Sequence, residues 1–166
     1  IHLHCFEYGR SSTNELENYC ESIVYYNRNM SIGNFISRTP YIVKSRANIE
    51  LLNNLSANDY PILFEGLHTT AFLKHKRLNG RSQYVRTHNI EHEYYYSLAS
   101  SERSLVKRFY LFCESRKLKR WEKNIAKADC IFTISENDNN YFQKYSKNIY
   151  IPAFHANENL NIESGI

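Results

Sequence analysis

The sequence is poor in residues that break regular structure, with 5 glycines and 3 prolines among 166 residues. Aromatic residues reach 14%, whereas disordered segments are depleted of them, so the composition favours a folded chain of about one domain. There is no run of about 18 apolar residues, which argues against a membrane-spanning helix, and no signal peptide pattern. Because the chain opens in an apolar run without Met, we expect its natural start to lie outside this sequence.

Several familiar motifs are also missing. The cysteines Cys5, Cys20, Cys113 and Cys130 show no CxxC spacing, so they are expected to be buried reduced thiols rather than disulfides or zinc ligands. There is no GxGxxG, Walker loop or GxSxG. The net charge of +4 is too small for a dedicated nucleic-acid binder, although it permits contact with phosphates or with a membrane surface.

Apolar runs that alternate with helical patterns predict the fold. The spacing predicts strands over Ile1–Phe6, Ile23–Tyr26, Ile62–Phe64, Gln83–Arg86, Cys130–Ile134 and Asn148–Ile151. It predicts helices over Ser12–Glu21, Ser45–Leu55, Thr69–Lys76, Ser104–Lys127 and Ser135–Tyr145, with Met30–Pro40 as an irregular loop. This alternation indicates an α/β protein, a Rossmann-like, doubly wound and mostly parallel sheet with helices on both faces.

The predicted helix over Ser104–Lys127 carries two kinds of side chain. Apolar residues that include Leu105, Phe109, Phe112 and Ile125 recur at helical spacing and predict one buried face. The other face is basic, and it is either simply solvated or attracted to anionic lipid or to a phosphorylated acceptor.

Ligands of such sheets bind beyond the carboxyl ends of the strands, which directs attention to polar residues directly after them. The densest cluster is Arg86–Glu93, RTHNIEHE, which permits three interpretations of His88. It is one ligand of an HxxEH zinc site with Glu91 and His92, or a polar group facing a ligand crevice, or a structural residue that caps the next helix. His68 follows another predicted strand and shares the last two interpretations.

Three segments, taken in order, resemble the amino-terminal domain of bacterial GT-B glycosyltransferases of the family-4-like group. They are Asp59–His68 (DYPILFEGLH), Tyr84–Asn89 (YVRTHN) and Lys127–Glu136 (KADCIFTISE), followed by Tyr150–Phe154 (YIPAF). The resemblance implies that residues 1–152 form one lobe of a GT-B enzyme whose first strand and Gly-rich turn are missing. Residues 153–166 would then be a linker toward a carboxy-terminal, donor-binding domain.

The resemblance also implies an activity, the transfer of a sugar from a nucleotide-sugar to a hydroxyl acceptor, either a glycan or a lipid-linked or polysaccharide acceptor. His88 matches the catalytic position of the family, and the substrate-binding candidates are Arg10, Glu65, His68, Asn89, Glu91, Ser135 and Glu136. Neither a metal nor a cofactor is implied beyond the nucleotide-sugar substrate. A cytoplasmic location at the inner face of the membrane, with peripheral membrane contact and no nucleic-acid partner, is expected, and this fragment alone should be inactive.

Three rival functions remain open from the sequence. The first is a Rossmann-like interaction module without catalysis. The second is a doubly wound enzyme of another class, such as a nucleotide-dependent epimerase or a hydrolase, for which Ser135 is the clearest nucleophile candidate. The third is the zinc enzyme described above.

Overall fold

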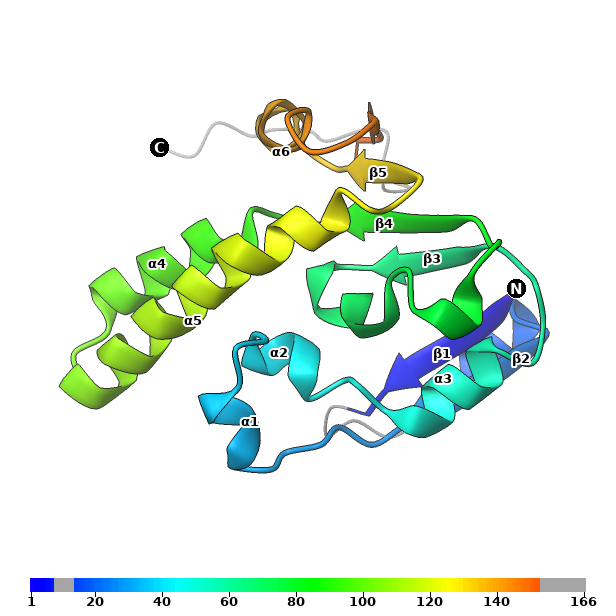
Figure 1. Ribbon diagram of the computed structural model, residues 1–166, viewed down its shortest axis with the longest axis horizontal. Coiled ribbons are helices and arrows are strands. Elements are labelled where there is room, and N and C mark those ends of the chain that lie inside the picture. The colour runs from blue at the N-terminus through cyan, green and yellow to red at the C-terminus, as the bar shows by residue number, and fades with distance from the viewer. Residues whose placement is uncertain (8–13, 153–166) are drawn as a thin grey trace, which may run out of the picture.

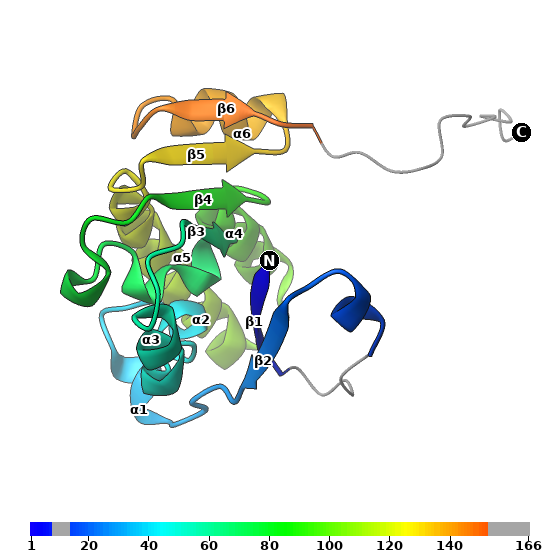
Figure 2. The ribbon, with the colours of Figure 1, turned by 90° about the vertical axis from the view of Figure 1, so that its right-hand side faces the viewer.

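A computed structural model describes residues 1–7 and 14–152 and contains six strands, all paired in parallel. The strands are β1 (His2–Phe6), β2 (Ser22–Tyr26), β3 (Ile62–Glu65), β4 (Gln83–Thr87), β5 (Cys130–Thr133) and β6 (Asn148–Tyr150). They form a two-stranded sheet, β1-β2, and a four-stranded sheet in the order β3-β4-β5-β6. Figures 1 and 2 show the larger sheet with the β1-β2 pair beside its β3 edge.

All six predicted strands are present, and the predicted Rossmann-like architecture of parallel strands flanked by helices is confirmed. The division into two sheets was not predicted. Within the described residues, β1 pairs only with β2, and β3 pairs only with β4. A cavity of about 580 Å³ lies between β1 and β3. It is lined mainly by apolar residues of these two strands and of helix α3 (Ile49–Leu55).

Five of the six α-helices, and the three 3-10 helices, surround these sheets as short elements. They are η1 (Asn14–Asn18), α1 (Gly33–Ile36), α2 (Tyr41–Lys44), α3 (Ile49–Leu55), η2 (Leu67–Phe72), η3 (Lys76–Leu78), α4 (Glu91–Ser101) and α6 (Glu136–Phe142). The predicted start of α3 at Ser45 is wrong, because the side chain of Asn48 accepts hydrogen bonds from the backbone N–H groups of Glu50 and Leu51.

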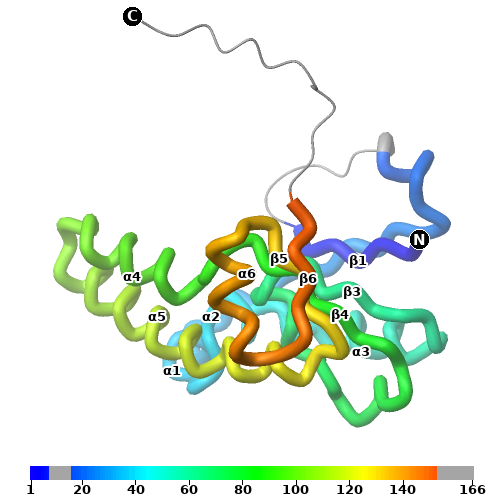
Figure 3. Tube along the Cα trace, turned by 90° about the horizontal axis from the view of Figure 1, so that it is seen from above, coloured from blue at the N-terminus to red at the C-terminus, as the bar shows by residue number. Residues whose placement is uncertain are grey.

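The longest helix, α5 (Leu105–Ile125), runs antiparallel to α4 as a hairpin that projects from the body (Figures 1 and 3). Its carboxy-terminal half is packed on the sheet through Leu118 and Ile125, which are fully buried. The prediction that Leu105 and Phe109 lie on the same buried face is wrong, since their exposed fractions are 70% and 71%. The helical periodicity is real, but the first half of α5 extends beyond the body that would cover it.

Two buried carboxylates hold this hairpin to the body. Glu122 on α5 lies 2.9 Å from Nδ1 of His92 on α4 and accepts a 2.7 Å hydrogen bond from the hydroxyl of Tyr141 on α6. Glu114, also fully buried, accepts 2.7 Å bonds from the backbone N–H of Tyr41 and from Lys117. Buried polar groups are tolerated where partners satisfy them, so these contacts fix α5 against α4, α6 and α2.

No helix in the described part of the chain is both long enough and apolar enough to cross a membrane. All four cysteines are free thiols, as predicted, but only Cys130 is fully buried and the other three are half-buried.

Candidate functional site

The carboxyl ends of β3 and β4 bring three charged or ionisable side chains together. Glu65 and Arg86 are register partners on neighbouring strands, and Nη1 of Arg86 donates a 3.0 Å hydrogen bond to Oε1 of Glu65. Nε2 of His88, just beyond β4, lies 3.0 Å from the same oxygen. The His88 side chain is 39% exposed and that of Glu65 is 47% exposed, so solvent or a ligand reaches both. We call Glu65, Arg86 and His88 the strand-end cluster.

A glycine shapes the loop directly after β3. Gly66 has φ 85° and ψ 152°, a backbone conformation that residues other than glycine rarely adopt. The His68 ring lies against Gly66, and a Cβ atom at this glycine would stand 2.5 Å from Cε1 of His68. Glycine is therefore required here both for the backbone conformation and for the close approach of the ring.

His68 is largely removed from water. Burial, with smaller contributions from the positive charges of Arg46 and His88, lowers the pKa of His68 to about 4. The imidazole is therefore neutral near pH 7, when one of its nitrogens donates a hydrogen bond and the other accepts one. Its electrostatic coupling to His88 ties it to the strand-end cluster.

Two polar residues follow His88 at the start of α4. Oδ1 of Asn89 is buried and has no hydrogen-bond partner in the described part of the chain. Burial, followed by the negative charge of Glu122, raises the pKa of Glu91 to about 7, so its carboxyl is partly protonated at neutral pH. An unpaired buried carbonyl oxygen is costly, and a donor group of a ligand would remove that cost at Asn89.

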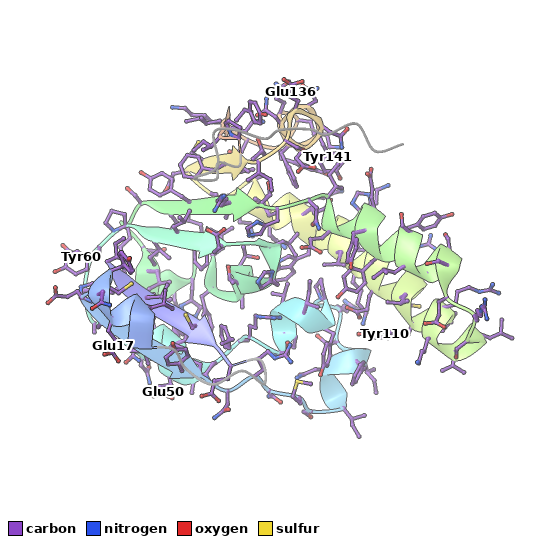
Figure 4. All side chains as sticks on the ribbon, turned by 180° about the vertical axis from the view of Figure 1, so that it is seen from behind. Glu17, Glu50, Tyr60, Tyr110, Glu136 and Tyr141 are labelled. Carbon is purple, nitrogen blue, oxygen red and sulfur yellow. The ribbon has the colours of Figure 1, made fainter. Side chains whose placement is uncertain are left out.

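Ser135 and Glu136 occupy the neighbouring strand end, after β5. The hydroxyl of Ser135 accepts a hydrogen bond of 3.1 Å from the backbone N–H of Asp138, so Ser135 caps α6, in agreement with the helix predicted from Ser135 onward. Glu136 is exposed on the outer side of α6, as Figure 4 shows. Thr87 at the end of β4 pairs with Thr133 at the end of β5. Ser135 and Glu136 therefore lie at the same sheet edge as His88, but they follow the neighbouring strand.

Two arginines remain, one of which was predicted as a site residue while the other was not. Arg10, a predicted substrate-binding residue, lies outside the described residues. Arg46, which follows α2, was not predicted, yet its charge influences both His68 and Glu91. The local sequence around Arg46 gave no signal, because only tertiary packing brings the α2 segment to the end of the larger sheet.

The zinc interpretation of the HxxEH spacing is wrong. His88 precedes α4, which begins at Glu91, so His88 and His92 do not share one helical face. The His92 ring is instead directed at buried Glu122. Among residues 1–7 and 14–152, no three His, Cys, Asp or Glu side chains converge as a metal site requires. Ser135 is equally weak as a nucleophile, since its oxygen is engaged in capping and no histidine among residues 1–7 and 14–152 is hydrogen-bonded to it.

The arrangement suits recognition of a polyhydroxylated or anionic ligand. It offers a cationic group in Arg86, an anionic acceptor in Glu65, and imidazoles that both donate and accept. These groups converge at the carboxyl end of parallel strands, where α/β proteins bind ligands.

Comparison with known proteins gives one informative relative. The chain is 28% identical over 152 residues to an uncharacterized 44.6 kDa protein in the cps region of Klebsiella pneumoniae. The alignment covers 89% of this chain but only 38% of the relative, so the chain spans well under half of that protein. No protein-family description and no solved structure matches the chain. The comparisons therefore show similarity to a protein of a cps region, whereas the α/β fold is shown by the strands and helices themselves.

Proposed function

We propose that this chain is the acceptor-side lobe of a glycosyltransferase and that its strand-end cluster faces the sugar during transfer. The observation that carries the proposal is the convergence of Arg86 and His88 on one carboxylate oxygen of Glu65, at the solvent-accessible ends of β3 and β4. Two of the three segments of family resemblance, Asp59–His68 and Tyr84–Asn89, contain these residues, and all three segments end at the same edge of the sheet. The similarity to a protein of a cps region is consistent with a role in polysaccharide synthesis.

In this proposal His88 is the catalytic residue. Its imidazole would contact a hydroxyl of the transferred sugar or of the acceptor, and Glu65 would hold the ring in place. Arg86 would keep the Glu65 carboxylate oriented through their 3.0 Å hydrogen bond. Positioning and electrostatic stabilisation would supply the rate enhancement, since negative charge develops on the leaving diphosphate.

The surrounding polar residues would bind the acceptor. The unpartnered Oδ1 of Asn89 would accept a hydrogen bond from a sugar hydroxyl, and neutral His68 would donate or accept another. Glu91, Ser135 and Glu136 would line the outer part of the same edge. The nucleotide-sugar would be held mainly by a second lobe, in keeping with a relative much longer than this chain.

The test is sugar transfer by the full-length protein with radiolabelled nucleotide-sugars. We expect His88→Ala to lower kcat/KM at least about tenfold, a loss typical of removing one positioned catalytic group. His75→Ala is the matched control, because the His75 side chain has local contacts: it caps η3, accepting from the backbone N–H of Arg77, and packs edge-on against Phe72. Unchanged transfer by His88→Ala, with an unaltered circular dichroism spectrum, would refute the assignment.

A second measurement tests the division of labour between lobes. The 166-residue chain should bind nucleotide-sugars only weakly in isothermal titration calorimetry, because the donor is assigned to the other lobe. Tight binding to this chain would show that the donor site has been placed on the wrong lobe.

A further inference from the structure

The tip of the α4–α5 hairpin exposes a continuous apolar surface. Leu105, Val106 and Phe109 have exposed fractions of 70%, 80% and 71%. Leu105 and Phe109 are four residues apart and therefore share one stripe of the helix. On α4, Tyr96 is exposed and lines the same groove as Leu105 and Phe109, and Leu98 is exposed elsewhere on the helix. Contiguous apolar surface of this kind marks an interaction site in a water-soluble domain.

The tip is also basic. Arg103, Lys107 and Arg108 are all exposed and lie between the apolar residues in sequence. Glu102 is the only carboxylate in the sequence from residue 94 to residue 113. Its side chain accepts a 2.9 Å hydrogen bond from the backbone N–H of Ser104, so it is used within the turn.

A shallow groove joins the two helices at this tip. It has a volume of about 420 Å³ and is lined chiefly by Tyr96, Leu105, Phe109 and Phe112. The guanidinium of Arg116 lies 5.3 Å from the Phe112 ring centre, so a cation borders the apolar groove farther along α5. Aromatic rings with polar ends and long basic side chains are the groups that settle at a lipid–water interface.

The hairpin is fixed to the body along its base as far as Tyr110, whose ring packs edge-on against Phe35 of α1, and its end beyond Phe109 projects from the body. Buried Glu114 and Glu122 fix α5 to α2, α4 and α6, whereas Figures 1 and 3 show the tip projecting away from both sheets. A flat surface can therefore meet the tip without first meeting the rest of the protein.

We propose that this hairpin tip, Tyr94–Phe112, docks on a membrane that contains anionic lipids. The apolar stripe would enter the boundary between headgroups and acyl chains, and Arg103, Lys107 and Arg108 would lie among the lipid phosphates. The charge pattern selects this occupant. A second copy would bring two basic tips together, and that like-charge contact is repulsive. This inference does not depend on the proposed sugar transfer.

The test is sedimentation of the 166-residue chain with vesicles of phosphatidylcholine, with and without phosphatidylglycerol. We expect binding to the anionic vesicles only, weakening as salt is added. Leu105→Ser/Phe109→Ser should lower the partition coefficient at least about tenfold, because each change removes the burial of one large apolar side chain. Ile49→Ser/Ile151→Ser is the matched control, since both isoleucines are exposed and lie outside the hairpin.

A second pair of variants tests the charge. Lys107→Glu/Arg108→Glu should also reduce binding at least about tenfold, by reversing two charges near the surface. Lys76→Glu/Lys147→Glu changes the net charge equally at positions outside the hairpin and should have a much smaller effect. Absence of vesicle binding by the unchanged chain, or equal losses in tip and control variants, would overturn the proposal. So would self-association in light scattering that the tip variants abolish, which would identify a second copy as the occupant.

Discussion

Replacing Gly66 by alanine should both strain the backbone and displace His68. The φ of 85° and ψ of 152° place this residue in a region that is nearly restricted to glycine, where another residue costs about 1 to 3 kcal/mol. The added Cβ would also stand 2.5 Å from Cε1 of His68, and moving the ring off its rotamer adds about 1 kcal/mol. The reduced entropy of the unfolded chain offsets about 0.4 to 1 kcal/mol. We expect a net loss of about 1 to 3.6 kcal/mol in the free energy of unfolding, with a central value of about 2 kcal/mol.

Gly80 provides the matched control. It has a similar φ of 81°, but no atom of the described residues lies within 4 Å of a Cβ added there. Gly80→Ala should therefore show the backbone strain alone, a net loss of about 1 kcal/mol. Urea unfolding followed by circular dichroism measures both variants. In a His68→Ala background, the loss caused by Gly66→Ala should fall toward the Gly80 value.

Two results would refute this reasoning. Equal losses for the alanine variants at Gly66 and Gly80 would mean that the ring of His68 does not lie against the glycine. A Gly66→Ala loss that stays unchanged in the His68→Ala background would mean that the two residues are not coupled, which a double-mutant cycle measures directly.

The buried groups and the sheet edges give three further predictions. The Glu91 carboxyl stabilises the fold below its unfolded pKa of 4.5, and this stabilisation is lost as the pH rises through about 7. Over that range the free energy of unfolding of Glu91→Gln should therefore rise by about 1 to 3 kcal/mol relative to that of the unchanged chain. Urea titrations at several pH values measure this difference, and a difference that does not depend on pH would contradict the prediction. Glu122→Leu removes the carboxylate partner of the His92 ring and one of the two hydrogen-bond partners of the Tyr141 hydroxyl, so it should lower the free energy of unfolding by about 2 to 5 kcal/mol. Glu136→Leu, at an exposed position, should change it little. If a further parallel strand of the full-length protein fills the cavity between β1 and β3, the backbone amides of these two strands should exchange more slowly in the full-length protein than in the 166-residue chain. Equal exchange rates in the two proteins would show that no such strand fills the cavity.

The strands could be predicted because each is a short apolar run bounded by turn residues. β3, for example, is the apolar run that follows the turn residues Asn58-Asp59-Tyr60-Pro61, and the turn residues Asn79-Gly80 precede β4 in the same way. Helix α4 was missed, since only His92 and Ala99 are buried along it and its tyrosines give no clear apolar period. The short helices α1 and α2 lie in segments too brief for periodicity to emerge.

The site was predictable in part. Parallel strands end at one edge, so the sequence could place Glu65 beside His88 once β3 and β4 were recognised as strands. It could not reveal the role of Gly66 under the His68 ring, or the influence of Arg46, because both depend on tertiary contacts. Exposure of the first half of α5 was hidden for the same reason: periodicity identifies an apolar stripe, but not whether the rest of the protein covers it.

The most direct test of the central claim is a double-mutant cycle between Glu65 and His88, measured as kcat/KM for sugar transfer by the full-length protein. If Glu65 acts by holding the imidazole at the sheet edge, Glu65→Gln should impair transfer, and Glu65→Gln/His88→Ala should be no worse than His88→Ala alone. Losses that simply multiply, or full activity in His88→Ala, would contradict the account.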